Sequence, residues 1–560
     1  MATAQLTRLG GLLDDWARRV VRQLDADTPY SESLIVQDVV LDPAARRACD
    51  DYCGDLSGRY LEAAALTRSL HRPLDWEKTQ RVARTVLAAQ RPDGSFGPDR
   101  PTATTDHGVA WGNGRLLTGL LAFADATKGP LHNEVWHAAE RLAEHLVTAM
   151  PGWLDWFADP QNQRLKFSLD FLSTLDPLVE WYRRTGDAAT LVAVKSAAAV
   201  IPEPDGDFHM HGYLLALRGW LELADILGDH DAVDAISERW RRVRAGWMLP
   251  HGGVLESLKM PRDINTECCG IADWIMLTLR LAAVSGQPHL LDIAELSLYN
   301  ALPHTQRGSG HYGCETLCAD PGLLTFDYPP EAWWCCTFHG LRAVYDAARA
   351  AVRPADDGLQ VDLYVDSSGM VNGIGYTLTT EYPRDGMATV HVDRPAQVRL
   401  RIPGTSRIAV LRVDGIAQPV RTAGGYVTVR ATKAVTVEFD RALWISSGQV
   451  RFLTPTANCT DETGPLHGRR GAFFHGPVLL GADAARNDPE NVLRSRRAEI
   501  HVRGDAFGLD PGEEPGTFHA TGLGFAGRFG LVLAPLADQI GYGRDVSTRI
   551  EFDEISAVNG

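Results

Sequence analysis

The hydrophobic pattern of this 560-residue chain changes near residue 355. Before that point apolar residues recur at spacings of three and four, as in Leu9, Leu12, Leu13, Trp16 and Val20, which is typical of one helix face. About a dozen such segments lie between residues 6 and 352, separated by short breaks rich in Gly, Pro and Asp. A dozen helices in hairpin pairs predict a closed toroid of six pairs. A helical solenoid is the alternative, but the sequence shows no fixed repeat period.

After residue 355 the segments become shorter and alternate apolar with polar residues. They are rich in Val, Ile, Thr and Tyr, and turns such as Ser368-Gly369 and Asp414-Gly415 separate them. This pattern predicts an antiparallel sandwich, followed by further strand-like segments near the C-terminus. A chain of this length favours two or three domains. We therefore predict a helical domain at residues 1–354, a β-sandwich at 355–445 and a second β-rich domain at 446–560.

Charge and composition exclude several classes of protein. The formal net charge of −16 argues against binding to nucleic acid or to an anionic membrane, and no basic run opposes this. Asp14 and Asp15 interrupt the first apolar stretch, so we expect no secretory signal peptide, and no stretch is long enough to span a membrane. We expect a cytoplasmic protein whose nine cysteines are reduced or metal-bound rather than bridged.

Two short stretches carry residues that bind metals. The first, at 265–274, contains Glu267 and Cys269, and the second, at 333–340, contains Cys335 and Cys336. One carboxylate and three thiolates form a tetrahedral ligand set that suits zinc. Each pair stands just before a helix-like run, and a helix N-terminus stabilises thiolates. The alternative is that these cysteines are core residues, because free cysteine often behaves as a small hydrophobe and adjacent cysteines are not a standard zinc spacing.

Together the motifs resemble those of the zinc-dependent β-L-arabinofuranosidases of glycoside hydrolase family 127 and their related hydrolases, over most of the chain. Glu267-Cys268-Cys269 resembles the family's Glu-x-Cys segment, Cys335-Cys336 its Cys-Cys pair and Tyr299-Asn300 its downstream signature. Residues 382–386 and 401–404 resemble turns of the family's β-sandwich, and residues 476–477 resemble its later strand. The resemblance implies an (α/α)6 barrel followed by antiparallel β-sandwich domains, which agrees with the periodicity.

The resemblance also implies a chemistry, the retaining hydrolysis of a glycosidic bond. Zinc would be held by Glu267, Cys269, Cys335 and Cys336, and Cys335 would be the nucleophile, because a metal-bound sulfur is kept as a thiolate. A glycosidase also needs an acid for the leaving oxygen. The family's acid/base glutamate lies upstream of the Glu-x-Cys segment, and Glu256 is the natural candidate.

Substrate contacts are implied less directly. His211 and His107 resemble the family's substrate-binding histidines, and Trp334 offers an aromatic wall on which a sugar ring can stack. The expected partner is a small glycoside or oligosaccharide, and a homodimer is compatible with the sequence. The chain departs from the family at residues 170–172 and 337–340, so the sugar itself stays open. Cys314 and Cys318 are either a second pair of ligands or a loop pair near the site.

Three functions follow from this reading. The first is a zinc-dependent retaining glycoside hydrolase acting on small glycosides such as β-L-arabinofuranosides. The second, motivated by the changed flanking residues and by a short loop between Glu256 and Glu267, is a related barrel lyase or tailoring enzyme. The third is a non-catalytic carbohydrate-binding protein with a structural zinc, since a closed site of four protein ligands is typical of structural zinc.

Overall fold

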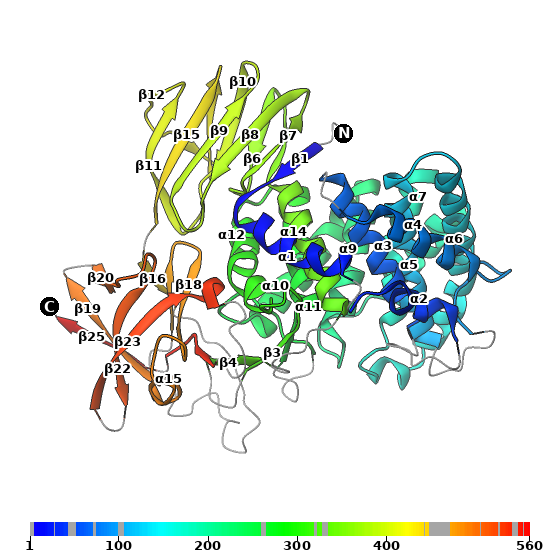
Figure 1. Cartoon of the computed structure of the whole chain (residues 1–560), viewed down its shortest axis with the longest axis horizontal. Coiled ribbons are helices and arrows are strands. Elements are labelled where there is room, and N and C mark those ends of the chain that lie inside the picture. The colour runs from blue at the N-terminus through cyan, green and yellow to red at the C-terminus, as the bar shows by residue number, and fades with distance from the viewer. Residues whose placement is uncertain are drawn as a thin grey trace.

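The computed structural model places a helical barrel beside two β-rich parts (Figure 1). The barrel lies on one side, and the two β-rich parts lie one above the other on the opposite side. The residues that the structure describes are 5–26, 29–42, 52–70, 74–98, 106–258, 265–317, 322–326, 334–441, 443–446, 471–503, 506–524, 527–539, 547–552 and 554–559.

Six inner helices form a closed ring in which each packs against the next, in the order α3, α5, α7, α9, α11, α14 and back to α3. Their bounds are Asp55–Ser69, Asp106–Ala126, Leu175–Thr185, Met210–Leu227, Cys268–Ser285 and Trp334–Ala350. Each inner helix also packs against an outer one: α4 (Trp76–Ala88), α6 (Pro130–Phe157), α8 (Ala188–Ala199), α10 (His230–Trp247), α12 (His289–Leu296) and α1 (Gly11–Asp25), in the same order. Helix α2 (Glu32–Val40) packs against α3 and α4. The predicted (α/α)6 barrel is confirmed.

Short breaks set the hairpins of the barrel. Gly186 and Gly228 adopt left-handed backbone angles that end α7 and α9. The next residues, Asp187 and Asp229, cap α8 and α10 by accepting hydrogen bonds from backbone N–H groups three residues ahead, at 2.7 and 3.0 Å. Helices α7 and α9 are thereby turned back into α8 and α10 within two residues.

Helix α11 lies in the core of the ring. Contrary to the expectation from the sequence, it is, among the described helices, one that is long and apolar enough to cross a membrane by length and composition, and 78% of that stretch is buried inside the protein. Its apolar character is that of a central barrel helix packed between α9 and α14.

The sandwich that follows consists of a seven-stranded sheet, β1-β7-β8-β9-β15-β11-β12, and a five-stranded sheet, β13-β14-β10-β6-β5. All pairs are antiparallel except β10 with β6. Strand β1 (Gln5–Leu9) pairs with β7, so Leu9 ends a strand of the sandwich and is not on the first helix, which begins at Gly11. The other strands are β5 (Val352–Ala355), β6 (Gly358–Val361), β7 (Ser367–Val371), β8 (Ile374–Thr380), β9 (Met387–Val392), β10 (Ala396–Arg401), β11 (Ser406–Val413), β12 (Ile416–Ala417), β13 (Thr422–Ala423), β14 (Tyr426–Ala431) and β15 (Ala434–Arg441).

A third sheet joins the C-terminal part to the barrel. Its main path is β2-β3-β4-β24-β18-β23-β22-β19-β20, in which β2 (Asn265–Glu267), β3 (Cys314–Leu317) and β4 (Leu323–Phe326) belong to the helical half of the sequence. The C-terminal elements are β16 (Leu443–Ser446), β17 (Ala472–His475), β18 (Val478–Asp483), α15 (Pro489–Arg494), β19 (Arg497–Arg503), β20 (Ala506–Gly508), β21 (Asp510–Pro511), β22 (Phe518–Gly524), β23 (Gly527–Pro535), β24 (Thr548–Arg549) and β25 (Glu554–Asn559). The exact boundaries at 354 and 445 stay predictions.

Asn300 links the helical barrel to the C-terminal part by hydrogen bonds. It lies in a π-helical segment, Ser297–Ala301, and its Nδ2 donates to the carbonyl of Pro477 at 2.9 Å. Its Oδ1 accepts from the backbone N–H of Leu479 at 2.8 Å. The Tyr299-Asn300 and Gly476-Pro477 motifs of the sequence therefore meet at the contact between barrel and C-terminal part.

Candidate functional site

The four predicted metal ligands, Glu267, Cys269, Cys335 and Cys336, lie together and are called here the Glu–Cys cluster. Their ligand atoms are all within 4.8 Å of one another. The Sγ atoms of Cys269 and Cys336 are 3.8 Å apart, and Sγ of Cys336 is 3.8 Å from Oε1 of Glu267. Tetrahedral zinc with Zn–S bonds of about 2.3 Å sets two sulfurs about 3.8 Å apart. The donor set and its spacing therefore fit zinc.

Two neighbouring inner helices bring this cluster together. Glu267 ends β2 and immediately precedes α11, whose first turn carries Cys269. Cys335 and Cys336 lie in the first turn of α14, which packs against α11. Both helix N-termini point their positive dipole ends at the sulfurs, which favours thiolates.

The three cysteines of the cluster are not equivalent. Cys269 and Cys336 are fully buried, whereas Cys335 is only partly buried and lines a cavity. Hydrogen bonds from Cys269 and Cys336 lower the pKa of the Cys335 thiol well below its usual value. The pKa of Cys336 is raised, because its bonds to the neighbouring sulfurs, first that of Cys269, favour its protonated form. The thiolate form is therefore favoured at Cys335, the one cysteine of the cluster that lines the cavity.

His209 holds Glu267 in its ionised form. Nε2 of His209 lies 2.8 Å from Oε2 of Glu267. Burial alone would raise the pKa of Glu267, but the hydrogen bond and charge of His209, together with His211 and Cys269, outweigh it and lower the pKa to about 2. Burial lowers the pKa of His209, but the bond to Glu267 and the negative charges of the neighbouring carboxylates together raise it. A carboxylate must be ionised to bind a metal, so this contact prepares Glu267 as a ligand.

The cavity in front of Cys335 has a volume of about 200 Å³, the space of roughly seven water molecules at about 30 Å³ each. It lies at the N-terminal ends of the inner helices and combines aromatic walls with polar groups. Its lining residues are Tyr52, Asp55, Arg59, Trp111, Phe167, Asp170, His209, His211, Glu267, Trp334 and Cys335. Ligand sites commonly combine an apolar wall with a few polar groups that fix orientation.

The predicted acid/base, Glu256, lies beside the cluster but does not line the cavity. Its Oε1 is 2.9 Å from Nζ of Lys166, and its carboxylate forms a group with His209 and Glu267 whose ligand atoms lie within 4.8 Å of one another. The backbone carbonyl of Glu256 also accepts from the N–H of Met210 at 2.7 Å. Glu256 is thus held close to Glu267, one of the predicted metal ligands.

The other predicted residues are placed as follows. His211 and Trp334 line the cavity. His107 belongs to the first turn of α5, but its side chain lies outside the described residues. Cys314 pairs in register with Glu267 across β2 and β3 and is hydrogen-bonded to Cys336, so it adjoins the cluster. Cys318 lies outside the described residues.

Sequence reasoning missed several wall residues, above all Arg59 and Asp170. Arg59 is 1% exposed, and its Nε donates to Asp55 at 2.7 Å. An Asp and an Arg four residues apart on a helix that is otherwise apolar on most sides were the available signal. Burial raises the pKa of Asp170 to about 7, although Tyr52 donates to it at 3.3 Å. No local pattern marks Asp170, because it stands in a short 3-10 segment before α7.

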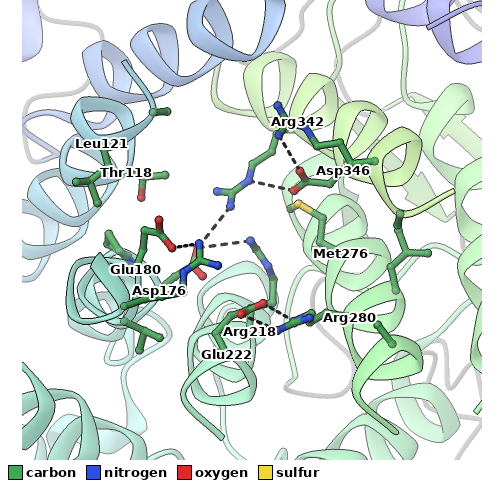
Figure 2. A pocket seen from close by; sticks show the side chains of 18 of the residues that line it. Thr118, Leu121, Asp176, Glu180, Arg218, Glu222, Met276, Arg280, Arg342 and Asp346 are labelled. Atoms are coloured by element: carbon green, nitrogen blue, oxygen red, sulfur yellow. Dashed lines mark hydrogen bonds and ion pairs between the residues drawn. The ribbon is translucent and has the colours of Figure 1, made fainter. Parts of the chain in front are cut away.

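A second cavity of about 630 Å³ lies towards the opposite, C-terminal ends of the inner helices (Figure 2). Arginines and carboxylates project into it from α7, α9, α11 and α14, among them Arg218, Arg280 and Arg342. Asp176 lies between Arg218 and Arg342, with N···O distances of 3.4 and 3.5 Å. Arginines and carboxylates in this second cavity pair with one another, whereas the cavity at the Glu–Cys cluster is lined by the thiol of Cys335.

Comparison with known proteins agrees with this architecture. No family model and no curated protein matches the sequence. Solved structures do match, among them a glycoside hydrolase family 127 β-L-arabinofuranosidase from Geobacillus stearothermophilus T6 (TM-score 0.74, 16% identity, covering 98% of this chain and 100% of that one), a family 127 β-arabinofuranosidase (0.75, 16%, 99% and 98%) and a glycoside hydrolase (0.69, 15%, 99% and 98%). At this identity the likeness concerns the fold. The chain therefore has, over nearly its whole length, the fold of the family 127 β-L-arabinofuranosidases.

Proposed function

We propose that the protein is a zinc-dependent retaining glycoside hydrolase that acts on small glycosides. The observation that carries the proposal is the asymmetry of the Glu–Cys cluster, in which only the Cys335 sulfur lines the cavity. A zinc held for stability alone needs no ligand exposed to a cavity with aromatic walls. The likeness in fold to family 127 enzymes supports the same function.

Cys335 in the cavity and Glu256 beside the Glu–Cys cluster suit the two steps of such a reaction. Zinc, when bound by the four residues of the cluster, would keep their sulfurs deprotonated. The Cys335 sulfur attacks the anomeric carbon, the bond to the leaving oxygen breaks, and Glu256 gives that oxygen a proton. Glu256 then takes a proton from water, the resulting oxygen attacks the anomeric carbon, and the Cys335 sulfur leaves as a thiolate.

The substrate we propose is a single terminal sugar, such as a β-L-arabinofuranoside. The cavity of about 200 Å³ has room for one small ring. Trp111 and Trp334 offer aromatic faces, and Tyr52, Asp170 and His209 offer polar atoms for hydroxyl groups. The two family 127 structures are of enzymes named for arabinofuranosides.

The decisive experiment is labelling with a haloacetamide-substituted sugar, followed by location of the adduct by mass spectrometry. An adduct on Cys335 that disappears in Cys335→Ser supports the hydrolase. Cys53→Ser is the control, because Cys53 is buried and stands apart from the cluster. Intact sugar binding without any label would instead support the carbohydrate-binding alternative.

Metal content is measured on the same preparations. About one zinc per chain is expected in the wild type, and Cys336→Ser should lose it because one of four ligands is gone. Freshly purified wild-type protein without zinc would overturn the mechanism.

A further inference from the structure

Asp273 lies in the middle of the barrel, between the two cavities. It is fully buried on α11 and has three hydrogen-bond partners on neighbouring helices. Its Oδ1 is 2.6 Å from Nη1 of Arg218 and 3.0 Å from Nε2 of His339, and its Oδ2 is bonded to Nδ1 of His211. Burial alone would raise the pKa of Asp273, but the two imidazoles, His339 first, bring it well below its usual value. Asp273 is therefore an ionised carboxylate that accepts from both histidines.

The other ring nitrogen of each histidine faces an arginine. Nε2 of His211 is 3.1 Å from Nη2 of Arg59, and Nδ1 of His339 is 3.5 Å from Nη2 of Arg115. A guanidinium only donates hydrogen bonds, so these ring nitrogens accept. Burial lowers the pKa of both histidines, which makes them neutral. The single proton of His211 is therefore on Nδ1, where Asp273 accepts it.

Arg59 connects this chain of bonds to the Glu–Cys cluster. Its Nη1 lies 3.4 Å from the backbone carbonyl oxygen of Cys335 and 4.0 Å from Sγ of Cys269. Its Nε is bound to Asp55, so three sides of the guanidinium are fixed at once. The third nitrogen of Arg59, Nη2, is held by its hydrogen bond to Nε2 of His211.

We propose that Asp273 is a positioning residue for the nucleophile: it fixes the Nδ1–H form of His211, and the free Nε2 lone pair then holds Arg59 against Cys335 and Cys269. The catalytic consequence rests on the proposed hydrolase function, while the hydrogen-bond chain itself does not. Both ring nitrogens of His211 are engaged, so this residue shapes the cavity wall and acts through Arg59. The predicted role of His211 in substrate binding becomes indirect.

The test is Asp273→Asn in zinc-loaded, ¹⁵N-histidine-labelled protein. The amide keeps the size of the carboxylate and can still accept from Arg218 and His339. Its NH2 group then faces Nδ1 of His211, which moves the ring proton to Nε2, opposite the donor of Arg59. We expect the His211 nitrogen shifts to report Nδ1–H in the wild type and Nε2–H in the variant, with zinc content unchanged.

Turnover supplies the second readout. We expect kcat to fall between about tenfold and about 10⁴-fold, as when a buried carboxylate that orients a catalytic histidine is replaced by its amide, with KM little changed because Asp273 touches no substrate. Asp176→Asn is the matched control. It removes another carboxylate bound to Arg218 but leaves His211 untouched, so its tautomer and kcat should stay near those of the wild type.

Three results would overturn the proposal: an Nε2–H tautomer in the wild type, an unchanged tautomer in Asp273→Asn, or a changed tautomer with unchanged kcat. If Asp273→Asn does not fold, Arg59→Lys replaces it. Lysine keeps the positive charge but lacks the planar set of N–H donors that a guanidinium has. We therefore expect kcat to fall while zinc is retained. An unchanged kcat would refute the role of Arg59. A protein without glycosidase activity would refute the proposed function, while the wild-type tautomer would still decide the hydrogen-bond chain.

Discussion

His209 and Glu267 share one hydrogen bond of 2.8 Å, which occupies Oε2 of the carboxylate and leaves Oε1 facing Cys336. The two oxygens of Glu267 are thus divided between His209, which immediately precedes α9, and the cysteines on α11 and α14. A metal ligand oriented by an outer partner binds its metal more tightly, because it is already ionised and correctly turned. His209 is therefore expected to contribute to metal affinity without binding the metal itself.

Replacing His209 by alanine should weaken zinc binding by about 10- to 100-fold, the usual effect of losing such an outer partner. Competition with a chromogenic chelator measures this affinity. His132→Ala is the control, since His132 bonds to the carbonyl of Ala124 on the outside of the barrel. Equal zinc affinity in all three proteins would show that Glu267 needs no help from His209.

Glu256→Gln should lower turnover of a substrate with a poor leaving group by about 10²- to 10⁴-fold, because glutamine cannot give the leaving oxygen a proton. An activated aryl glycoside should be affected less, since its leaving group needs little protonation. Zinc content should not change. Glu203→Gln is the control, because Glu203 also pairs with basic side chains, Arg239 and Arg242, outside the site. Wild-type turnover of the poor substrate would remove Glu256 from the mechanism.

Asp170 should make the protein less stable as the pH rises. Its folded-state pKa of about 7 lies above the value of 3.8 for an unburied aspartate, so the folded state favours the neutral acid. Relative to low pH, stability is lost between about pH 4 and pH 7, and the difference of about three pKa units corresponds to roughly 4 kcal/mol. Asp170→Asn should therefore raise the free energy of unfolding more at pH 7.5 than at pH 5.

Denaturant unfolding at both pH values, with the zinc state held fixed, checks this. Asp187→Asn provides a control of the opposite sign. Hydrogen bonds from Thr190 lower the pKa of Asp187, so its carboxylate stabilises the fold above pH 4 and that contribution is lost in acid. A stabilising effect of Asp170→Asn that did not grow with pH would contradict the buried, neutral state of Asp170.

Asn300→Ala should destabilise the contact between the barrel and the C-terminal part. The substitution leaves the carbonyl of Pro477 and the N–H of Leu479 without their side-chain partner in a buried place. Each such group costs about 1–3 kcal/mol. Limited proteolysis should release the C-terminal part faster than in Asn487→Ala, where a comparable side-chain bond to Val532 lies within that part. Equal release would mean that the sheet alone holds the two parts.

Local pattern was enough to predict the barrel, the sandwich and the Glu–Cys cluster. Gly186-Asp187 and Gly228-Asp229 predict where one helix ends and the next begins. The cysteines and the nearby glutamate predict a set of metal ligands. Strand β1 was missed because Leu9 continues the helical spacing of Leu12 and Leu13, and its true partner, Ser367, is far along the chain. The pairing that decides its structure leaves no trace in the neighbouring residues.

Arg59 and Asp273 were missed for a related reason. Both lie on helices whose apolar content predicts burial, and an ionised group is buried only when partners from other helices neutralise it. The partners of Asp273 come from α9 and α14, so their identity depends on which helices are neighbours in the ring. Hydrophobic spacing in the sequence predicts each helix, but it does not predict which helices pack against each other.

Strand β2, which ends in Glu267, lies at one end of the sheet that continues through β4 and β24 into β18. The C-terminal part is consequently tied through one continuous sheet to the strand that carries Glu267. A chain without β24 would lose the strand that pairs with β4, and β4 in turn pairs with β3, the partner of β2 and Glu267. We therefore expect a fragment that ends before the C-terminal strands to hold Glu267 less firmly, because β2 would then lie in a sheet of only β2, β3 and β4.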